Sequence, residues 1–176
     1  MIRKIICSCL FLLLPVQSIL AEEPFPLKLG DDLKKAELVL GDLLPCYKIV
    51  FPGLNEEDIK NLISKGTSRC VGSKKYGVFL GITSHDKIHS IRINREHAEF
   101  EITKPLYGIL PTSDFKSIRA ACGSPIKDEK NGSEYRTYVF RCQDVLVEAT
   151  FLLKDTSSYK RVRAGELITF AVENAL

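Results

Sequence analysis

Two stretches, residues 22–100 and 101–176, have the pattern of degenerate copies of one unit, and this repeat constrains the fold more than any single motif. Asp32 opens a short amphipathic stretch, and Asp114 opens another of the same length. Each stretch closes at a glycine. Three further correspondences follow in the same order: Arg69-Cys70 with Arg141-Cys142, Val78–Leu80 with Val145–Val147, and Lys87–Ile93 with Glu166–Val172. The sequence therefore predicts a tandem duplication.

Local signals indicate the elements of each copy. An acidic cap and a terminal glycine predict one helix over residues 33–40 and another over 115–122. Apolar alternation predicts strands over 135–141 and 145–153, and Asn55 can begin an added helix that ends before Gly66. We predict an α+β fold with a β-α-β-β-β unit in each copy. Its sheets are antiparallel, with short helices on one face.

The N-terminal segment has the layout of a secretory signal. Arg3 and Lys4 precede an apolar run, and residues 1–21 end in a small residue, Ala21. A spanning helix needs about 20 apolar residues, and this run is too short. We expect a cleaved signal peptide, no transmembrane anchor in the mature form, and a periplasmic or secreted protein.

Cysteine usage agrees with an oxidising compartment. Two of the six cysteines lie in the signal segment, and the other four allow three pairings. The duplication favours one disulfide per copy: Cys46 with Cys70, and Cys122 with Cys142. The alternative, a zinc site formed by the four cysteines, lacks a C-x-x-C pair.

Charge excludes one class of ligand. The chain has 25 basic and 22 acidic side chains, and two of the basic ones lie in the signal segment. The rest is nearly neutral, so we expect no nucleic-acid partner.

The residues that suggest catalysis have structural explanations. All three histidines, His85, His89 and His97, lie close together with Asp86, which raises a metal-binding or hydrolase alternative. On the extended chain expected there, His85 and His89 are well separated, without the one-face spacing that H-x-x-x-H has on a helix. Adjacent Ser84, His85 and Asp86 cannot form a triad. We therefore expect no enzyme activity, no catalytic residue, no metal ligand and no cofactor.

One segment is typical of a contact surface. Residues 154–165 join two predicted strands by a long connection that the first copy replaces with a short turn. Its tyrosine and cations are side chains that often anchor interfaces. We predict partner binding through Tyr159, Lys160, Arg161 and Arg163; a solvated loop is the alternative.

The tandem scheme of a helix ending in glycine and then a β-meander, with one disulfide per copy, resembles the secreted β-lactamase inhibitory proteins. It also resembles the small outer-membrane assembly lipoproteins, which have a single copy. The resemblance implies a protein whose sheets or loops clamp another protein. We expect an exported, non-catalytic protein-binding module of the inhibitor or immunity type, acting on an envelope or secreted enzyme or toxin. A periplasmic structural or envelope-assembly factor is the alternative.

Overall fold

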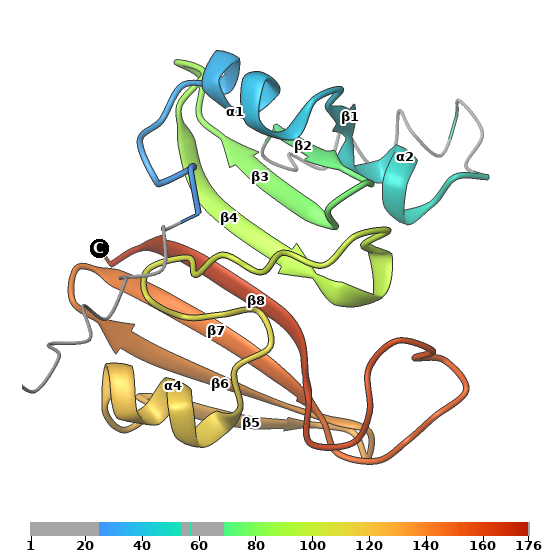
Figure 1. Ribbon diagram of the computed structural model, residues 1–176, viewed down its shortest axis with the longest axis vertical. Coiled ribbons are helices and arrows are strands. Elements are labelled where there is room, and N and C mark those ends of the chain that lie inside the picture. Colours follow the sequence, from blue (N-terminus) through green and yellow to red (C-terminus); the bar gives the residue numbers. More distant parts are fainter. Residues whose placement is uncertain (1–24, 54–56, 58–68, 176) are drawn as a thin grey trace, which may run out of the picture.

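A computed structural model describes residues 25–53, 57 and 69–175 of the chain. These residues contain one antiparallel eight-stranded sheet with the order β1-β2-β3-β4-β8-β7-β6-β5 (Figure 1). The strands are β1 (Leu44–Pro45), β2 (Cys70–Ser73), β3 (Val78–Ile82), β4 (Ile88–Asn94), β5 (Lys127–Asn131), β6 (Tyr135–Cys142), β7 (Val145–Leu152) and β8 (Leu167–Asn174). The helices are α1 (Leu33–Leu40), α2 (Cys46–Val50), α4 (Phe115–Cys122) and the 3-10 helix η1 (Arg95–His97).

The two helices expected from their end signals, α1 and α4, are present. Asp114 caps α4, because its carboxylate accepts a hydrogen bond of 2.8 Å from the Ser117 backbone N–H. Gly123 ends α4 with a φ of 84°, and Gly41 ends α1 with a φ of 76°. Glycine adopts this left-handed region without the steric cost that a side chain brings, so both helices stop where the sequence predicts.

The sheet is assembled from two groups of strands. Each half of the chain has one eight-residue helix followed by four strands, and β4 of the first half pairs with β8 of the second. Ile91 lies opposite Val172 in this central pairing. One continuous sheet therefore replaces the separate sheets expected from the sequence.

The strand expected before each helix is not formed. In the first half, an isolated bridge joins Asp32 to Lys87, and in the second one joins Leu106 to Ile109. The backbone around Leu27 bonds to scattered partners instead of a ladder, while the Leu27 side chain is buried in the core. Among the described residues, the first half begins with α1, β1 and α2 and continues with three strands, and the second is α4 followed by four strands, so the β-α-β-β-β order was wrong.

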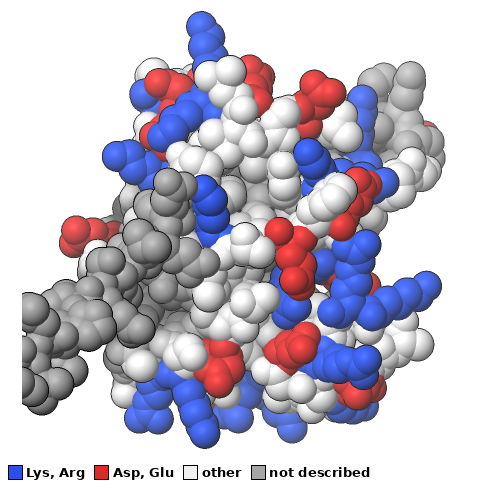
Figure 2. All heavy atoms as spheres, in the orientation of Figure 1, with Lys and Arg blue, Asp and Glu red and all other residues white. Residues whose placement is uncertain are grey.

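One face of the sheet carries the main core. Ala36 of α1 and Ile118 of α4 belong to the same buried cluster, together with Ile102 and Leu106 of the linker between the halves. Both helices and the linker therefore cover the same face, which we call the helix face. Figure 2 shows this face, where acidic and basic atoms are interspersed around a mostly uncharged centre.

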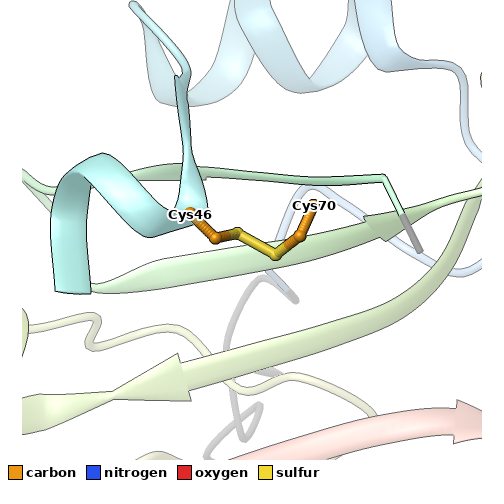
Figure 3. Close-up of a disulfide and its surroundings, with 2 residues drawn as sticks. All are labelled: Cys46 and Cys70. Carbon is orange, nitrogen blue, oxygen red and sulfur yellow. A yellow bond between two sulfur atoms is a disulfide. The ribbon is translucent and has the colours of Figure 1, made fainter. Parts of the chain in front are cut away.

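Both expected disulfides are present. Cys46 at the start of α2 bonds to Cys70 on β2 (Figure 3), and Cys122 at the end of α4 bonds to Cys142 on β6. The expected signal peptide, residues 1–21, and nearly all of the expected helix 55–66 lie outside the described residues. None of the described helices is long and apolar enough to span a membrane.

Candidate functional site

The second face of the sheet, which we call the open face, is crossed by a row of residues in which uncharged and charged side chains are mixed. Strand register aligns one residue from each strand, because alternate residues of a strand share a face. The row runs Leu44, Gly72, Phe79, Arg92, Ala171, Glu148, Val139 and Lys127. Apolar and charged side chains from both halves thus lie on one surface.

A groove of about 420 Å³ lies at the centre of this open face. Small residues form its floor, with Gly81 on β3, Ser90 on β4 and Ala171 on β8. A methyl group on Gly81 would overlap the Ser90 hydroxyl and lie 2.7 Å from the His89 ring. The absence of a side chain at Gly81 therefore lets the β4 side chains pack over β3 and leaves space for the groove above it.

The apolar wall of the groove comes from the first half. Helix α2 packs over Gly72, where an added methyl group would lie 3.1 Å from the Ile49 side chain. Val50 of α2 lines the groove, and so does Phe79, whose ring meets the His97 ring edge-on at 6.1 Å. The Cys46–Cys70 disulfide ties α2 to β2, so this wall is covalently fixed.

The opposite part of the groove is charged. Arg92 on β4 and Glu148 on β7 form an ion pair of 3.5 Å across the junction of the two halves. Their side chains are 54% and 43% exposed, so water screens the pair and it contributes little stability. Glu173 on β8 also lines the groove and is exposed. The charged groups are therefore available to a partner at small cost.

The predicted binding loop, residues 154–165, lies at one end of this face. Tyr159 is half-buried against a small cluster that contains Leu152, Val162 and Ile168, and burial raises the pKa of its hydroxyl. The other predicted residues have exposed side chains: Lys160, Arg161 and Arg163. Tyr159 thus anchors the loop to this apolar cluster, while the cations are exposed to solvent.

The histidine region does not form one site. His85 is exposed in the β3–β4 turn, where its Nδ1 lies 3.2 Å from the Ser84 hydroxyl. Asp86 pairs with Arg69, and His97 lies in η1 beside Phe79. Among the described residues, no group of three or more His, Cys, Asp and Glu side chains is placed to hold a metal ion.

The groove was not predicted from the sequence. Its lining comes from seven elements that the strand register brings together. One signal pointed to it: Gly81 interrupts an apolar strand, and a glycine inside a strand often marks a close approach by another group. No local pattern in the sequence indicated that Arg92 pairs with Glu148.

We compared the chain with protein-family models, curated proteins and solved structures, and found no match in any of the three. The functional argument therefore depends on the geometry of the open face.

Proposed function

We propose that this chain is an exported, non-catalytic protein-binding module that inhibits or neutralises an envelope or secreted enzyme or toxin. The groove on the open face carries the proposal. It combines an apolar wall, a floor of small residues and exposed charges, which is the mixture found at protein interfaces. A loop of a folded partner fits this composition, and the predicted partner-binding residues Tyr159, Lys160, Arg161 and Arg163 lie at one end of the same surface.

Two features support a rigid binding surface. The groove floor belongs to β3, β4 and β8, which are each paired on both sides. The apolar wall is held by a disulfide, so little ordering is needed when a partner binds. The two disulfides also fit a periplasmic or secreted location, where such bonds persist.

We further propose that the two halves arose by tandem duplication, as in the secreted β-lactamase inhibitory proteins that the chain resembles. The support is the mirror-image strand order, with a helix before each group of four strands and one disulfide in each half. A duplicated unit that joins through its last strands would place a new surface across the junction. The groove occupies that position.

Affinity capture from an envelope extract, with mass spectrometry, tests the proposed function. The parent chain should retain a specific enzyme or toxin and reduce its activity when the two purified proteins are mixed. Ala171→Tyr should fill the groove floor and weaken capture at least about tenfold, because one bulky group at an interface centre blocks close packing. The matched control is Ala120→Tyr, at an exposed position of α4 on the helix face.

Equal capture by the parent chain and Ala171→Tyr would reject the groove as the binding surface. Capture of an outer-membrane complex without inhibition would favour the envelope-assembly alternative. Turnover by the purified chain that is lost on changing His97→Gln would favour an enzyme.

A further inference from the structure

The loop that joins β7 to β8, residues 154–165, is folded against the sheet. Val162 is 3% exposed and packs with Leu152 and Ile168. Tyr159 packs on the same cluster, and the Gly165 backbone N–H donates to the Leu152 carbonyl at 2.7 Å. The loop therefore has a fixed conformation before any partner arrives.

Carboxylates from three places hold the loop backbone. Glu96 of η1 accepts hydrogen bonds from the backbone N–H groups of Lys160 at 2.9 Å and Arg161 at 3.1 Å. Asp155 accepts from the Ala164 N–H at 2.8 Å, and Glu166 accepts from the Arg163 N–H at 3.2 Å. The nearby acids thus bind the backbone and do not pair with the loop cations.

The cationic side chains of the loop face outward. Four exposed cations lie on it, and within the part of the chain that the structure describes none of them forms an ion pair: Lys154, Lys160, Arg161 and Arg163. The chain is otherwise nearly neutral, so this loop presents a local positive field.

Helix η1 connects this cationic loop to the groove. Glu96 holds the loop, and the next residue, His97, lines the groove. We propose that loop and groove form one binding surface for an acidic segment of a partner protein, with Glu96 as the positioning residue that presents Lys160 and Arg161. This inference rests on the proposed function and adds the chemistry of the partner.

The composition of the groove favours a protein segment over a phosphate polymer or an anionic lipid. Glu148 and Glu173 line the groove and would repel a uniformly charged polyanion. Phe79 and Val50 offer apolar contact at the same site. A protein segment can place carboxylates on the loop and uncharged side chains in the groove.

A pair of synthetic peptides tests this assignment without knowledge of the natural partner. The probe is a fluorescent dodecapeptide with four glutamates followed by alternating valine and threonine, and its analogue has glutamine at the four acidic positions. Fluorescence anisotropy at low salt should show binding of the acidic peptide and at least about tenfold weaker binding of the analogue. Added salt should weaken the acidic peptide's binding.

Charge reversal at the loop gives the matched comparison. Lys160→Glu with Arg161→Glu should weaken binding of the acidic peptide at least about tenfold. Lys34→Glu with Lys116→Glu changes the net charge equally at exposed positions of α1 and α4, and should leave binding near that of the parent. Equal effects of the two pairs, or no binding of the peptide to the parent, would overturn the inference.

Glu96→Gln separates positioning from simple charge. The change removes a negative charge, which alone would strengthen binding of an acidic peptide, but it also removes an acceptor that holds the loop. We expect faster hydrogen exchange at the Lys160 and Arg161 amides and weaker peptide binding. Unchanged exchange or tighter binding would reject Glu96 as a positioning residue.

Two further outcomes keep this inference distinct from the proposed function. A captured partner that is lost with Ala171→Tyr but retained with Lys160→Glu and Arg161→Glu would preserve the protein-binding function and reject the acidic segment. Binding of polyphosphate or phosphatidylglycerol vesicles as tight as that of the acidic peptide would reject a protein-specific surface.

Discussion

The two halves of the molecule share a frame and differ where they border the open face. Each half has an eight-residue helix that ends at a glycine, four antiparallel strands and one disulfide. The first half adds α2 and has glycines within β2 and β3, whereas strands β5–β8 contain no glycine. The second half adds the loop 154–165. The shared parts build the core, and the differing parts shape the groove and its rim.

The disulfides show the same division. Cys142 belongs to the main core, so the Cys122–Cys142 bond fixes α4 to the helix face. Cys70 lines the groove, so the Cys46–Cys70 bond fixes α2 on the open face. One bond therefore supports the core, and the other supports the groove.

Removal of each disulfide in turn should test this division of roles and give the largest losses of stability. The bonds join cysteines 24 and 20 positions apart, and loop closure of that size contributes about 3 kcal/mol in each case. Cys122→Ala with Cys142→Ala also removes buried core atoms, which adds about 1 kcal/mol. Urea denaturation should therefore show the greater loss for this pair. An equal or greater loss for Cys46→Ala with Cys70→Ala would contradict the division of roles.

An exchange of the central helix residues should show that the two helix sites are not interchangeable. Ala36 of α1 and Ile118 of α4 are both fully buried. Ile118→Ala should cost about 3 kcal/mol, because it leaves a cavity beneath α4. Ala36→Ile should cost about 2 kcal/mol, because extra atoms crowd a packed site beneath α1. Thermal and urea unfolding measure both variants, and a stabilising Ala36→Ile would show that α1 has spare room.

The strand glycines of the first half allow a finer test. A methyl group on Gly72 would lie 2.5 Å from the Val78 carbonyl oxygen, so backbone must move, and we expect a cost of about 2 kcal/mol. At Gly81, the overlapping atoms are the ends of the Ser90 and His89 side chains, which can rotate. Gly81→Ala should therefore cost less stability but weaken partner capture. The reverse ranking in urea unfolding would show that Gly81, and not Gly72, is the tighter packing position.

The helix caps should give the smallest difference between the halves. Asp114 accepts a hydrogen bond from Ser117, whereas the Asp32 side chain forms no cap bond and pairs instead with Lys87 at 2.6 Å. Asp114→Ala should lower the melting temperature by a few degrees, and Asp32→Ala should lower it less. Melting curves of the two variants at neutral pH measure this difference, and equal shifts would show that the cap bond adds nothing.

The same cap predicts a pH dependence. The hydrogen bond with Ser117 holds the pKa of the Asp114 carboxyl below its ordinary value of 3.8. A lowered pKa in the folded state means that this stabilisation is complete above the unfolded value and is lost as the pH falls through the folded one. The difference in melting temperature between parent and Asp114→Ala should therefore shrink in acid below pH 3.8. A difference that persists there would assign the effect to something other than the ionised cap.

Local signals in the sequence were sufficient for α1, α4 and the β6–β7 hairpin, and the repeat pattern led to the disulfide pairing, whereas α2 was not predicted. Asp114 and Gly123 mark the ends of α4, and β6 and β7 carry clear apolar alternation. Strand β5, with the sequence KDEKN, is exposed along its whole length. A charged edge strand of this kind has no core-facing pattern, so periodicity could not reveal it.

The single sheet and the groove required information that no local pattern contains. The pairing of Ile91 with Val172 joins residues far apart in sequence, and either strand could have formed an outer edge. Leu27 lies in the core without forming a strand, in the same buried cluster as Ile102 and Leu106 of the linker. The positions of the groove residues depend on this pairing, so the sequence could indicate only the cationic loop of the proposed binding surface.

The pairing of β4 with β8 also sets the order in which the sheet can form. β8 follows β4 at a long distance along the chain, so β4 keeps an unpaired edge until residues 167–174 have been synthesised and have paired with it. Pairings between residues so distant along the chain slow folding, and an open edge that carries Ile91 and Ile93 can accept a strand from another molecule. Prompt pairing with β8 therefore protects β4 from strand exchange between two molecules.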